Sequence, residues 1–206
     1  MKNRDYKNFA PGTIFHIYNR GNNREKIFYN QEDYRAFLFR IGLALGIEPE
    51  VLQKENLLSI PHSRIRINAN KNLFKLHAFC LMPNHFHLLV EQTDKIPISK
   101  LISQICTSYA MYVNKKYKRV GHVFQDQFKS ILIENNSQLM WVSSYIHMNS
   151  VKDGLAKHPN EYKWSSYDSY TSKKNLPIVY TNLLKSVFGP KNFEKETLVL
   201  CVKDAL

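Results

Sequence analysis

Residues 73–92 read LFKLHAFCLMPNHFHLLVEQ, and Met-Pro-Asn at residues 82–84 separates two extended apolar runs. Proline and asparagine favour turns, so the stretch predicts two antiparallel strands joined by a tight connection. Because successive side chains of a strand point to opposite faces, His85 and His87 share one face while Phe86 lies on the other. The stretch therefore predicts a hairpin with one apolar face and one face that presents two imidazoles.

The segments around this hairpin predict an alternation of strands and helices. Asn30 precedes acidic residues and an apolar helical pattern, and Asn135 or Asn136 stands in the same place before a later helix that Gly154 ends. The expected elements are a strand at 12–21, helices at 31–45, 97–118 and 137–154, a strand or hairpin at 120–134, loops at 47–72 and 155–170, and one or two short helices after 170. This order predicts an α+β fold of ferredoxin-like (RRM-like) type, with helices packed on an antiparallel sheet.

The composition favours a polyanionic partner. The 206 residues include 29 Lys and Arg against 17 Asp and Glu, which gives a formal charge of +12. A basic surface attracts phosphates and releases their counterions, so nucleic acid is the first candidate. Cys80, Cys106 and Cys201 form no CxxC pair, which argues against a disulfide framework or a thiolate zinc site. No apolar run reaches the roughly 18–20 residues of a membrane span, and the start lacks a signal-peptide pattern, so a cytoplasmic protein is expected.

A pair of histidines two residues apart is by itself a weak indication of a metal site, since such pairs often only line a half-buried face. It gains weight from the last long helix, where Trp141, Tyr145 and Asn149 follow each other at four-residue steps and so share one face. The imidazoles of His85 and His87 with the amide oxygen of Asn149 suit Mg²⁺ or Mn²⁺ and leave positions for a substrate phosphate. A phenol beside such an ion is a candidate nucleophile.

Other tyrosines and histidines leave alternatives open. Tyr109 and Tyr112 occupy another helix and would serve as nucleophiles equally well on spacing alone. His147 points elsewhere on the last long helix and is more readily explained by packing or by a bond to the backbone. The sequence assigns no role to His122 or His16.

Four stretches resemble, in the same order, the single-tyrosine HUH transposases of the insertion-sequence-200-like group, including the repetitive-extragenic-palindrome-associated tyrosine transposases. The stretches are MPNHFHLLV (82–90), SYAMYVNKKYKRVGHVFQDQFKS (108–130), YIHMNSVKDGL (145–155) and WSSY (164–167). By this resemblance, which runs from about residue 10 to 170, His85 and His87 are the two histidines of the HUH motif. Tyr145 matches the nucleophile of the family, and Asn149 matches its third metal ligand.

The resemblance implies cleavage of single-stranded DNA near hairpins or palindromes, with a 5′-phosphotyrosine intermediate and a free 3′-hydroxyl, and rejoining by the reverse step. It also implies a divalent cofactor, Mg²⁺ or Mn²⁺. The family contains dimers and monomers, so a homodimer stays open. Three positions depart from the family pattern: Asp126-Gln127 stands in place of the common Gly-Arg, and Ser150 stands in place of the usual proline. The first change removes a potential contact with a DNA phosphate.

Basic residues clustered in the sequence are the candidates for DNA contact. Some follow the first strand and others end the second predicted helix or open the strand after it: Arg20, Arg24, Lys115, Lys116, Lys118, Arg119 and Lys129. For any one of them a solvated surface position is an equally good interpretation. Tyr112, Tyr117 and Phe124 lie among them and could stack on unpaired bases, although core packing is favoured for Tyr112 and Phe124.

The chain is thus expected to be a metal-dependent tyrosine transposase that cleaves and rejoins single-stranded DNA. Residues 1–170 form the expected transposase domain, and residues 171–206 form a C-terminal extension. The alternative is a catalytically silent protein of the same fold that binds DNA hairpins. A third hypothesis is a phosphodiesterase in which a metal-activated water attacks and Tyr145 is only structural.

Overall fold

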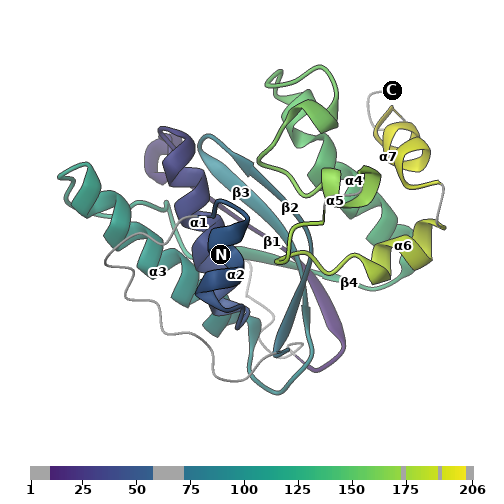
Figure 1. Cartoon of the computed structure of the whole chain (residues 1–206), viewed down its shortest axis with the longest axis horizontal. Helices are drawn as coiled ribbons and strands as arrows, with labels where there is room; N and C mark the ends of the chain where they lie inside the picture. The colour runs from purple at the N-terminus through teal and green to yellow at the C-terminus, as the bar shows by residue number, and fades with distance from the viewer. Residues whose placement is uncertain (1–9, 58–71, 173–174, 190–191, 203–206) are drawn as a thin grey trace.

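The computed structural model describes residues 10–57, 72–172, 175–189 and 192–202. Its centre is a four-stranded antiparallel sheet with the strand order β2-β3-β1-β4 (Figure 1). The strands are β1 (Thr13–Arg20), β2 (Phe74–Met82), β3 (His85–Gln92) and β4 (Lys129–Ile133). The predicted hairpin forms β2 and β3, and β1 pairs with β3 at the centre of the sheet. The ferredoxin-like fold is thereby confirmed.

Helices cover both faces of this sheet, with α1, α2 and α3 on one side and α4 to α7 on the other (Figure 1). The helices are α1 (Gln31–Ala44), α2 (Pro49–Lys54), α3 (Ile98–Lys116), α4 (Asn136–Lys152), α5 (Asp168–Thr171), α6 (Asn182–Phe188) and α7 (Phe193–Val202), with 3₁₀ turns η2 (Asn22–Arg24) and η3 (Pro159–Glu161). Among the described segments, no helix is long and apolar enough to cross a membrane.

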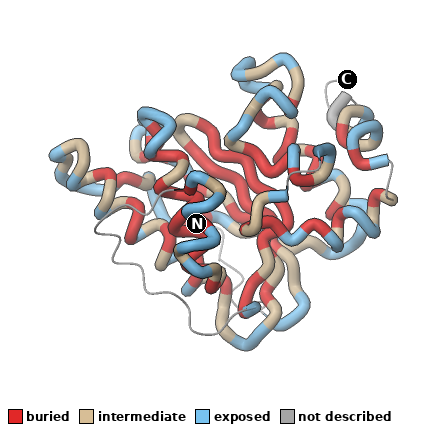
Figure 2. The backbone as a smooth tube through the Cα atoms, viewed as in Figure 1, coloured by how far each residue is buried: buried red, intermediate tan, exposed pale blue. Residues whose placement is uncertain are grey.

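The alternation of side chains along the strands divides the core in two. Phe86 and Leu88 pack with α1 and α3, whereas Leu89 packs with the α4 residues Val142 and Ile146. Buried positions accordingly follow the central strands and the inward sides of the helices (Figure 2). The apolar face predicted for the hairpin is confirmed, and the histidine face is turned toward α4.

The expected helix boundaries are confirmed where a capping residue marks them. The Asn30 side chain accepts hydrogen bonds from the first turn of α1, and the Asp33 carboxylate reaches back to the Asn30 N–H. Asn135 caps α4 by accepting from the Gln138 N–H at 2.9 Å. Gly154 follows α4 with φ of +69°, a conformation that glycine adopts without strain.

Three expectations were wrong in part. Only Lys129–Ile133 of the predicted strand or hairpin at 120–134 is a strand, because residues 120–128 run as a loop whose backbone bonds to the end of β1. The predicted loop at 47–72 contains α2, in which Pro49 occupies the first turn, where no N–H is needed; its residues 58–71 lie outside the described residues. The predicted loop at 155–170 contains η3 and the start of α5.

The WSSY segment holds α4 against β2. The Ser166 hydroxyl bonds to His147 of α4 at 2.8 Å and accepts from the Phe79 N–H at 2.8 Å, while the Ser166 N–H donates to the Phe79 carbonyl at 3.0 Å. The Leu81 N–H donates to the Trp164 carbonyl at 2.9 Å. His147 is completely buried, in agreement with the packing role predicted for it. This chain of bonds fixes the position of α4 along the sheet.

The buried His147 should make folding stability depend on pH. Burial lowers the pKa of His147 from its ordinary 6.5 to about 3, so the unfolded chain binds a proton that the folded chain excludes. Stability contributed by the neutral ring is complete above pH 6.5 and is lost as pH falls toward 3. The unfolding free energy of the native protein should decrease between pH 7 and pH 5. In His147→Gln this decrease should be smaller by about 2 kcal/mol, as measured by urea denaturation at both pH values. The exposed His122, changed to Gln, should leave that decrease as it is.

Candidate functional site

His85 and His87 lie at the start of β3 with their rings on the α4 side of the sheet. In the antiparallel register His85 is opposite Arg20 of β1, and His87 is opposite Tyr18. The two imidazole centroids are 5.1 Å apart and their planes are nearly perpendicular, at 85°. The hairpin thus places both rings at one end of the sheet, between β2 and β1.

Helix α4 brings Tyr145 and Asn149 to this pair of histidines. The Tyr145 ring meets the His87 ring edge to face, with 5.6 Å between centroids. Asn149 lies one turn further along, and its Nδ2 donates to the Tyr145 carbonyl at 2.7 Å. The Trp141 ring stacks on Tyr145 at 5.5 Å, with 10° between the planes. Of the four predicted site residues, His85, His87 and Tyr145 thus have neighbouring rings, and Asn149 follows Tyr145 by one helical turn.

Each of the three candidate ligands has one polar atom held by the protein. The Nδ1 of His85 is 2.6 Å from Oδ1 of Asn84, and the Nδ1 of His87 is 2.9 Å from Nε2 of His16. The Nδ2 of Asn149 is held by the Tyr145 carbonyl. The atoms that remain, both Nε2 and one Oδ1, are the atom types that bind divalent cations. Within the described ranges, no group of three or more His, Cys, Asp or Glu residues is arranged to hold an ion. The candidate set of His85, His87 and Asn149 is not such a group, because its third member is an amide.

Burial sets the protonation of these groups. Desolvation and the positive charge of Arg20 together lower the pKa of His85 to about 4. Burial also lowers the pKa of His87 well below its ordinary value, so both imidazoles are neutral at pH 7. Burial raises the pKa of the Tyr145 phenol, and a hydrogen bond from the Asn149 side chain opposes that rise. Tyr145 is therefore a protonated phenol beside two neutral imidazoles.

His16 is the residue of this cluster to which the sequence assigned no role. Its buried ring bonds to His87, stacks on it at 5.1 Å and meets the Tyr145 ring at 6.0 Å. Alternation along β1 puts His16 on the same face as Tyr18 and Arg20. That signal is present in the sequence, but it identifies the site only once β1 is known to pair with β3.

The alternative tyrosines lie on the opposite face of the sheet. Tyr109 of α3 is completely buried, and its hydroxyl donates to the Ile27 carbonyl at 2.6 Å. The Tyr112 hydroxyl donates to Asp33 at 3.0 Å. Both belong to the core between α1 and α3, on the side away from the histidine rings.

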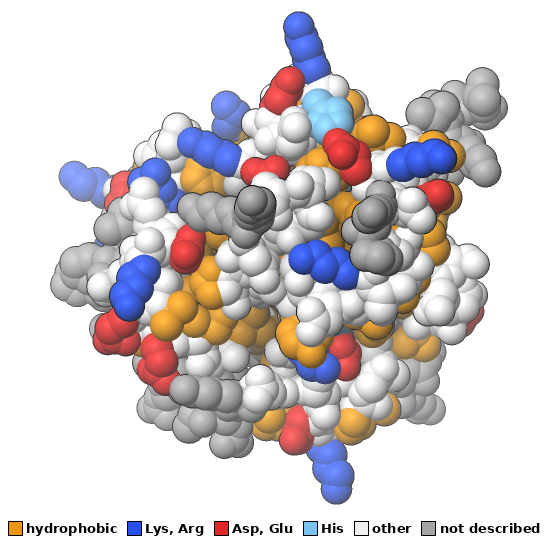
Figure 3. All heavy atoms as spheres, turned by 45° about the vertical axis from the view of Figure 1, so that its right-hand side comes forward, with side chains coloured by type: hydrophobic (Ala, Val, Ile, Leu, Met, Phe, Trp, Pro, Cys, Tyr) orange, Lys and Arg blue, Asp and Glu red, His pale blue; other side chains and the backbone are white. Residues whose placement is uncertain are grey.

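The basic residues predicted to contact DNA fall into two groups. Arg20 lies on β1, next to the strand of the histidines, and Lys129 lies on β4, one strand further away. The Lys129 Nζ is 6.0 Å from the centre of the Tyr18 ring. The others lie in η2 and at the end of α3, where Lys115 and Lys118 are exposed. They are Arg24, Lys115, Lys116, Lys118 and Arg119. The surface that carries α5 to α7 mixes Lys and Arg with Asp and Glu and shows no large basic patch (Figure 3).

Two basic residues of the second group form ion pairs with the protein itself. Lys116 contacts the Glu32 carboxylate at 2.7 Å and the completely buried Asp33 carboxylate at 2.8 Å. Arg119 contacts Glu25 at 3.2 Å. The positive charges of Lys116 and Arg119 are therefore balanced by acidic groups at the start of α1 and in the loop before it.

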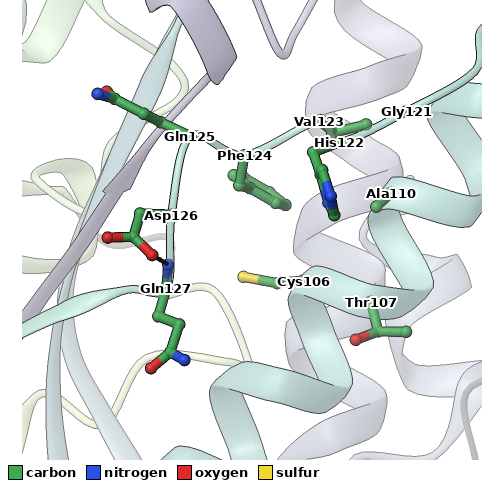
Figure 4. Close-up of a pocket in the computed structure, with 10 residues that line it drawn as sticks. All are labelled: Cys106, Thr107, Ala110, Gly121, His122, Val123, Phe124, Gln125, Asp126 and Gln127. Atoms are coloured by element: carbon green, nitrogen blue, oxygen red, sulfur yellow. Dashed lines mark hydrogen bonds between the residues drawn. The ribbon is translucent and has the colours of Figure 1, made fainter.

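A pocket of about 460 Å³ lies between α3 and the loop that leads to β4 (Figure 4). Cys106 and Ala110 of α3 face Phe124 and His122 across it, and Asp126 lies at its edge. The Asp126 carboxylate accepts from the Gln127 N–H at 2.7 Å, and its carbonyl accepts from the Asn19 side chain at 3.0 Å. The departure from the family pattern thus helps to shape a loop on the side of the sheet that carries α3.

Comparisons with known proteins give a family and a fold for this chain. A sequence model of the family described as "Transposase IS200 like" matches residues 11–149. Among solved structures, that of a REP-associated tyrosine transposase bound to a REP hairpin superposes with a TM-score of 0.60 at 18% identity, over 88% of this chain and 92% of that chain. At this identity the likeness shows a shared fold. No curated protein gave a significant match.

The ion pairs of Lys116 predict a structural role that can be separated from DNA binding. Lys116→Met leaves the buried Asp33 without its cation, so we expect a loss of about 1–3 kcal/mol in unfolding free energy, measured by urea denaturation. The affinity for a DNA hairpin, measured by fluorescence anisotropy, should change less than about twofold. Lys115→Met is the matched control, because it removes an exposed charge next to the same position and should leave stability unchanged. Weaker DNA binding at unchanged stability in Lys116→Met would contradict this role.

Proposed function

This chain belongs to the IS200-like transposase family, and from that membership we propose that it cleaves and rejoins single-stranded DNA beside hairpins, with Tyr145 as the nucleophile. The observation that carries the proposal is the contact between the Tyr145 ring and His87, at 5.6 Å, with Asn149 one helical turn away. Tyr109 and Tyr112, the alternatives on spacing, lie in the core on the opposite face. Tyr18 of β1 also contacts His87, at 5.7 Å between ring centroids. Tyr145 is favoured over Tyr18 because it shares a helix face with Asn149, one turn away.

In the proposed reaction the Tyr145 Oη attacks a backbone phosphorus. An O–P bond forms to the tyrosine, the bond between phosphorus and the 3′-oxygen breaks, and the phenolic proton is lost. The departing 3′-oxygen takes up a proton and becomes a free 3′-hydroxyl, while the downstream strand stays attached through a 5′-phosphotyrosine. Because the phosphodiester is exchanged and not hydrolysed, the reverse step rejoins the strand without a nucleotide cofactor.

We propose that His85 and His87 through Nε2, and Asn149 through Oδ1, hold one Mg²⁺ or Mn²⁺. Support comes from the second polar atom of each side chain, which is held by Asn84, His16 or the Tyr145 carbonyl and so orients the free atom. The neutral state of both imidazoles at pH 7 also suits a ligand role. When bound, such an ion supplies stabilisation of the negative charge that develops on the phosphate oxygens.

We further propose that cationic side chains around Tyr145 orient the DNA backbone. Arg20 lies opposite His85 on β1, Lys129 lies on β4, and the Lys152 Nζ is 5.1 Å from the centre of the Tyr145 ring. Fixed positive charges stabilise a phosphate without reorganisation during the reaction. The transposase of similar fold is bound to a REP hairpin, and we extend hairpin DNA as the substrate class to this chain.

The nucleophile is tested by trapping the covalent intermediate. The protein is incubated with Mn²⁺ and a hairpin oligonucleotide from its own genomic palindromes, labelled at the 3′ end so that the label stays with the 5′-phosphotyrosine fragment. A labelled band that survives denaturation is expected for the native protein. Tyr145→Phe should reduce it more than about 10³-fold, because the attacking oxygen is absent. Tyr112→Phe should leave it at the native level.

The other outcomes of this assay decide between the remaining hypotheses. A cleaved strand without an adduct would indicate attack by water, with Tyr145 in a structural role. Tight hairpin binding with neither cleavage nor adduct would indicate a silent DNA-binding protein. An adduct that persists in Tyr145→Phe would contradict the assignment of this tyrosine.

The contact between His16 and His87 predicts that His16 supports metal binding. If His87 binds the metal through Nε2, its ring proton is on Nδ1. The Nε2 of His16 is 2.9 Å from this Nδ1 and is placed to accept a hydrogen bond from it. We expect His16→Phe to weaken Mn²⁺ binding about 10- to 100-fold, measured by electron paramagnetic resonance without DNA. His16→Gln, which can place an amide oxygen near the same point, should retain most of the affinity. Equal affinity in His16→Phe and the native protein would contradict this role.

A further inference from the structure

Trp141 is an exposed aromatic residue directly beside the proposed nucleophile. Its ring stacks parallel on Tyr145, one helical turn away, yet 40% of Trp141 is exposed to solvent. Burying a large aromatic side chain would stabilise the fold. Its exposed position at the site is thus not explained by packing on Tyr145 alone.

The neighbouring strand surface is exposed as well. Ile131 of β4 pairs with His16 and therefore lies on the α4 side of the sheet, and it is 44% exposed. Lys129 lies two residues before it on the same face and is also exposed. Helix α4 packs mainly over β2 and β3. The side chains of Ile131 and Lys129 on β4 stay exposed to solvent.

Positive charges border this apolar surface. The Lys129 Nζ is 6.0 Å from the centre of the Tyr18 ring, and the Lys152 Nζ is 5.1 Å from the centre of the Tyr145 ring. Proteins that bind single-stranded nucleic acid combine basic side chains for the phosphates with aromatic rings on which unpaired bases stack. Both components occur beside Tyr145, with Lys152 over its ring and Trp141 stacked on it.

We propose that the exposed side of Trp141 is a stacking platform for the unpaired nucleobase next to the phosphate that Tyr145 attacks. The proposal rests on the proposed function and deepens it, because it assigns a binding site to a base of the substrate strand. Tyr145 must approach the phosphorus closely, and Trp141 is its stacked neighbour, so a base joined to that phosphate through its sugar comes within reach of the indole. Stacking tolerates any base, so Trp141 would add affinity and alignment without strong sequence selectivity.

The platform is tested by the fluorescence of Trp141. The chain has two tryptophans, so Trp164→Phe makes Trp141 the single tryptophan, and Tyr145→Phe prevents turnover. Hairpin oligonucleotides are compared in which each unpaired position in turn lacks its base. We expect intact DNA to quench the fluorescence of Trp141. Removal of the base next to the cleaved bond should abolish this quenching and weaken binding about 5- to 150-fold.

A double-mutant cycle separates stacking from mere support of the Tyr145 ring. Trp141→Ala should weaken the binding of intact DNA by the same factor as the abasic position weakens binding to the parent protein. Trp141→Ala should bind the abasic DNA no more weakly than it binds intact DNA. Met111→Ala, which shortens an exposed apolar side chain on α3, should bind as the parent does. The cycle is measured by fluorescence anisotropy of labelled DNA with Trp164 retained, because Trp141→Ala together with Trp164→Phe leaves no tryptophan.

Two results would overturn the platform. One is that no abasic position is coupled to Trp141→Ala, and the other is that Trp141→Ala binds intact DNA as tightly as the parent. The proposed reaction is judged separately, since the covalent adduct is measured with Trp141 present. An adduct without base coupling refutes the platform alone, whereas coupling without an adduct refutes the reaction alone.

Discussion

The antiparallel pairing of β1 with β3 is the constraint on which the site depends. It sets His85 opposite Arg20 and His87 opposite Tyr18, and it brings His16 to the edge of His87. Because side chains alternate along a strand, a shift of one residue would turn both histidines into the core of α1 and α3. Phe86 between them and Leu88 after them pack into that core and so hold the imidazoles on the α4 side.

The second half of the site comes from α4, and its position is fixed by bonds outside the site. His147 bonds to Ser166, which in turn bonds to the backbone of β2 at Phe79. β2 is also the hairpin partner of β3, so α4 and the histidines are attached to the same strand pair. The bonds from His147 through Ser166 to Phe79 thus hold α4 where Tyr145 contacts His87.

Local patterns predicted the parts of the structure that depend on local physics. The turn at residues 82–84, the caps at Asn30 and Asn135, and the shared helix face of Tyr145 and Asn149 follow from neighbouring residues in the chain. The course of residues 120–128 could not be predicted in this way, because their backbone bonds lead to the distant end of β1.

Side-chain contacts between segments that are distant in the sequence also could not be predicted. The contact of His16 depends on which strands pair, and the pairing of Lys116 with Asp33 depends on how α1 and α3 pack. A helical or strand pattern shows which face a residue occupies. It does not show which element covers that face.

The ion pairs at the start of α1 limit how many of the 29 Lys and Arg residues can serve as DNA contacts. Lys116 and Arg119 already pair with Glu32, Asp33 and Glu25, so they offer little uncompensated positive charge to a DNA phosphate. The slope of log affinity against log salt counts only phosphates that gain a new cation. For binding to DNA, that slope would therefore report fewer phosphate contacts than the number of basic residues suggests.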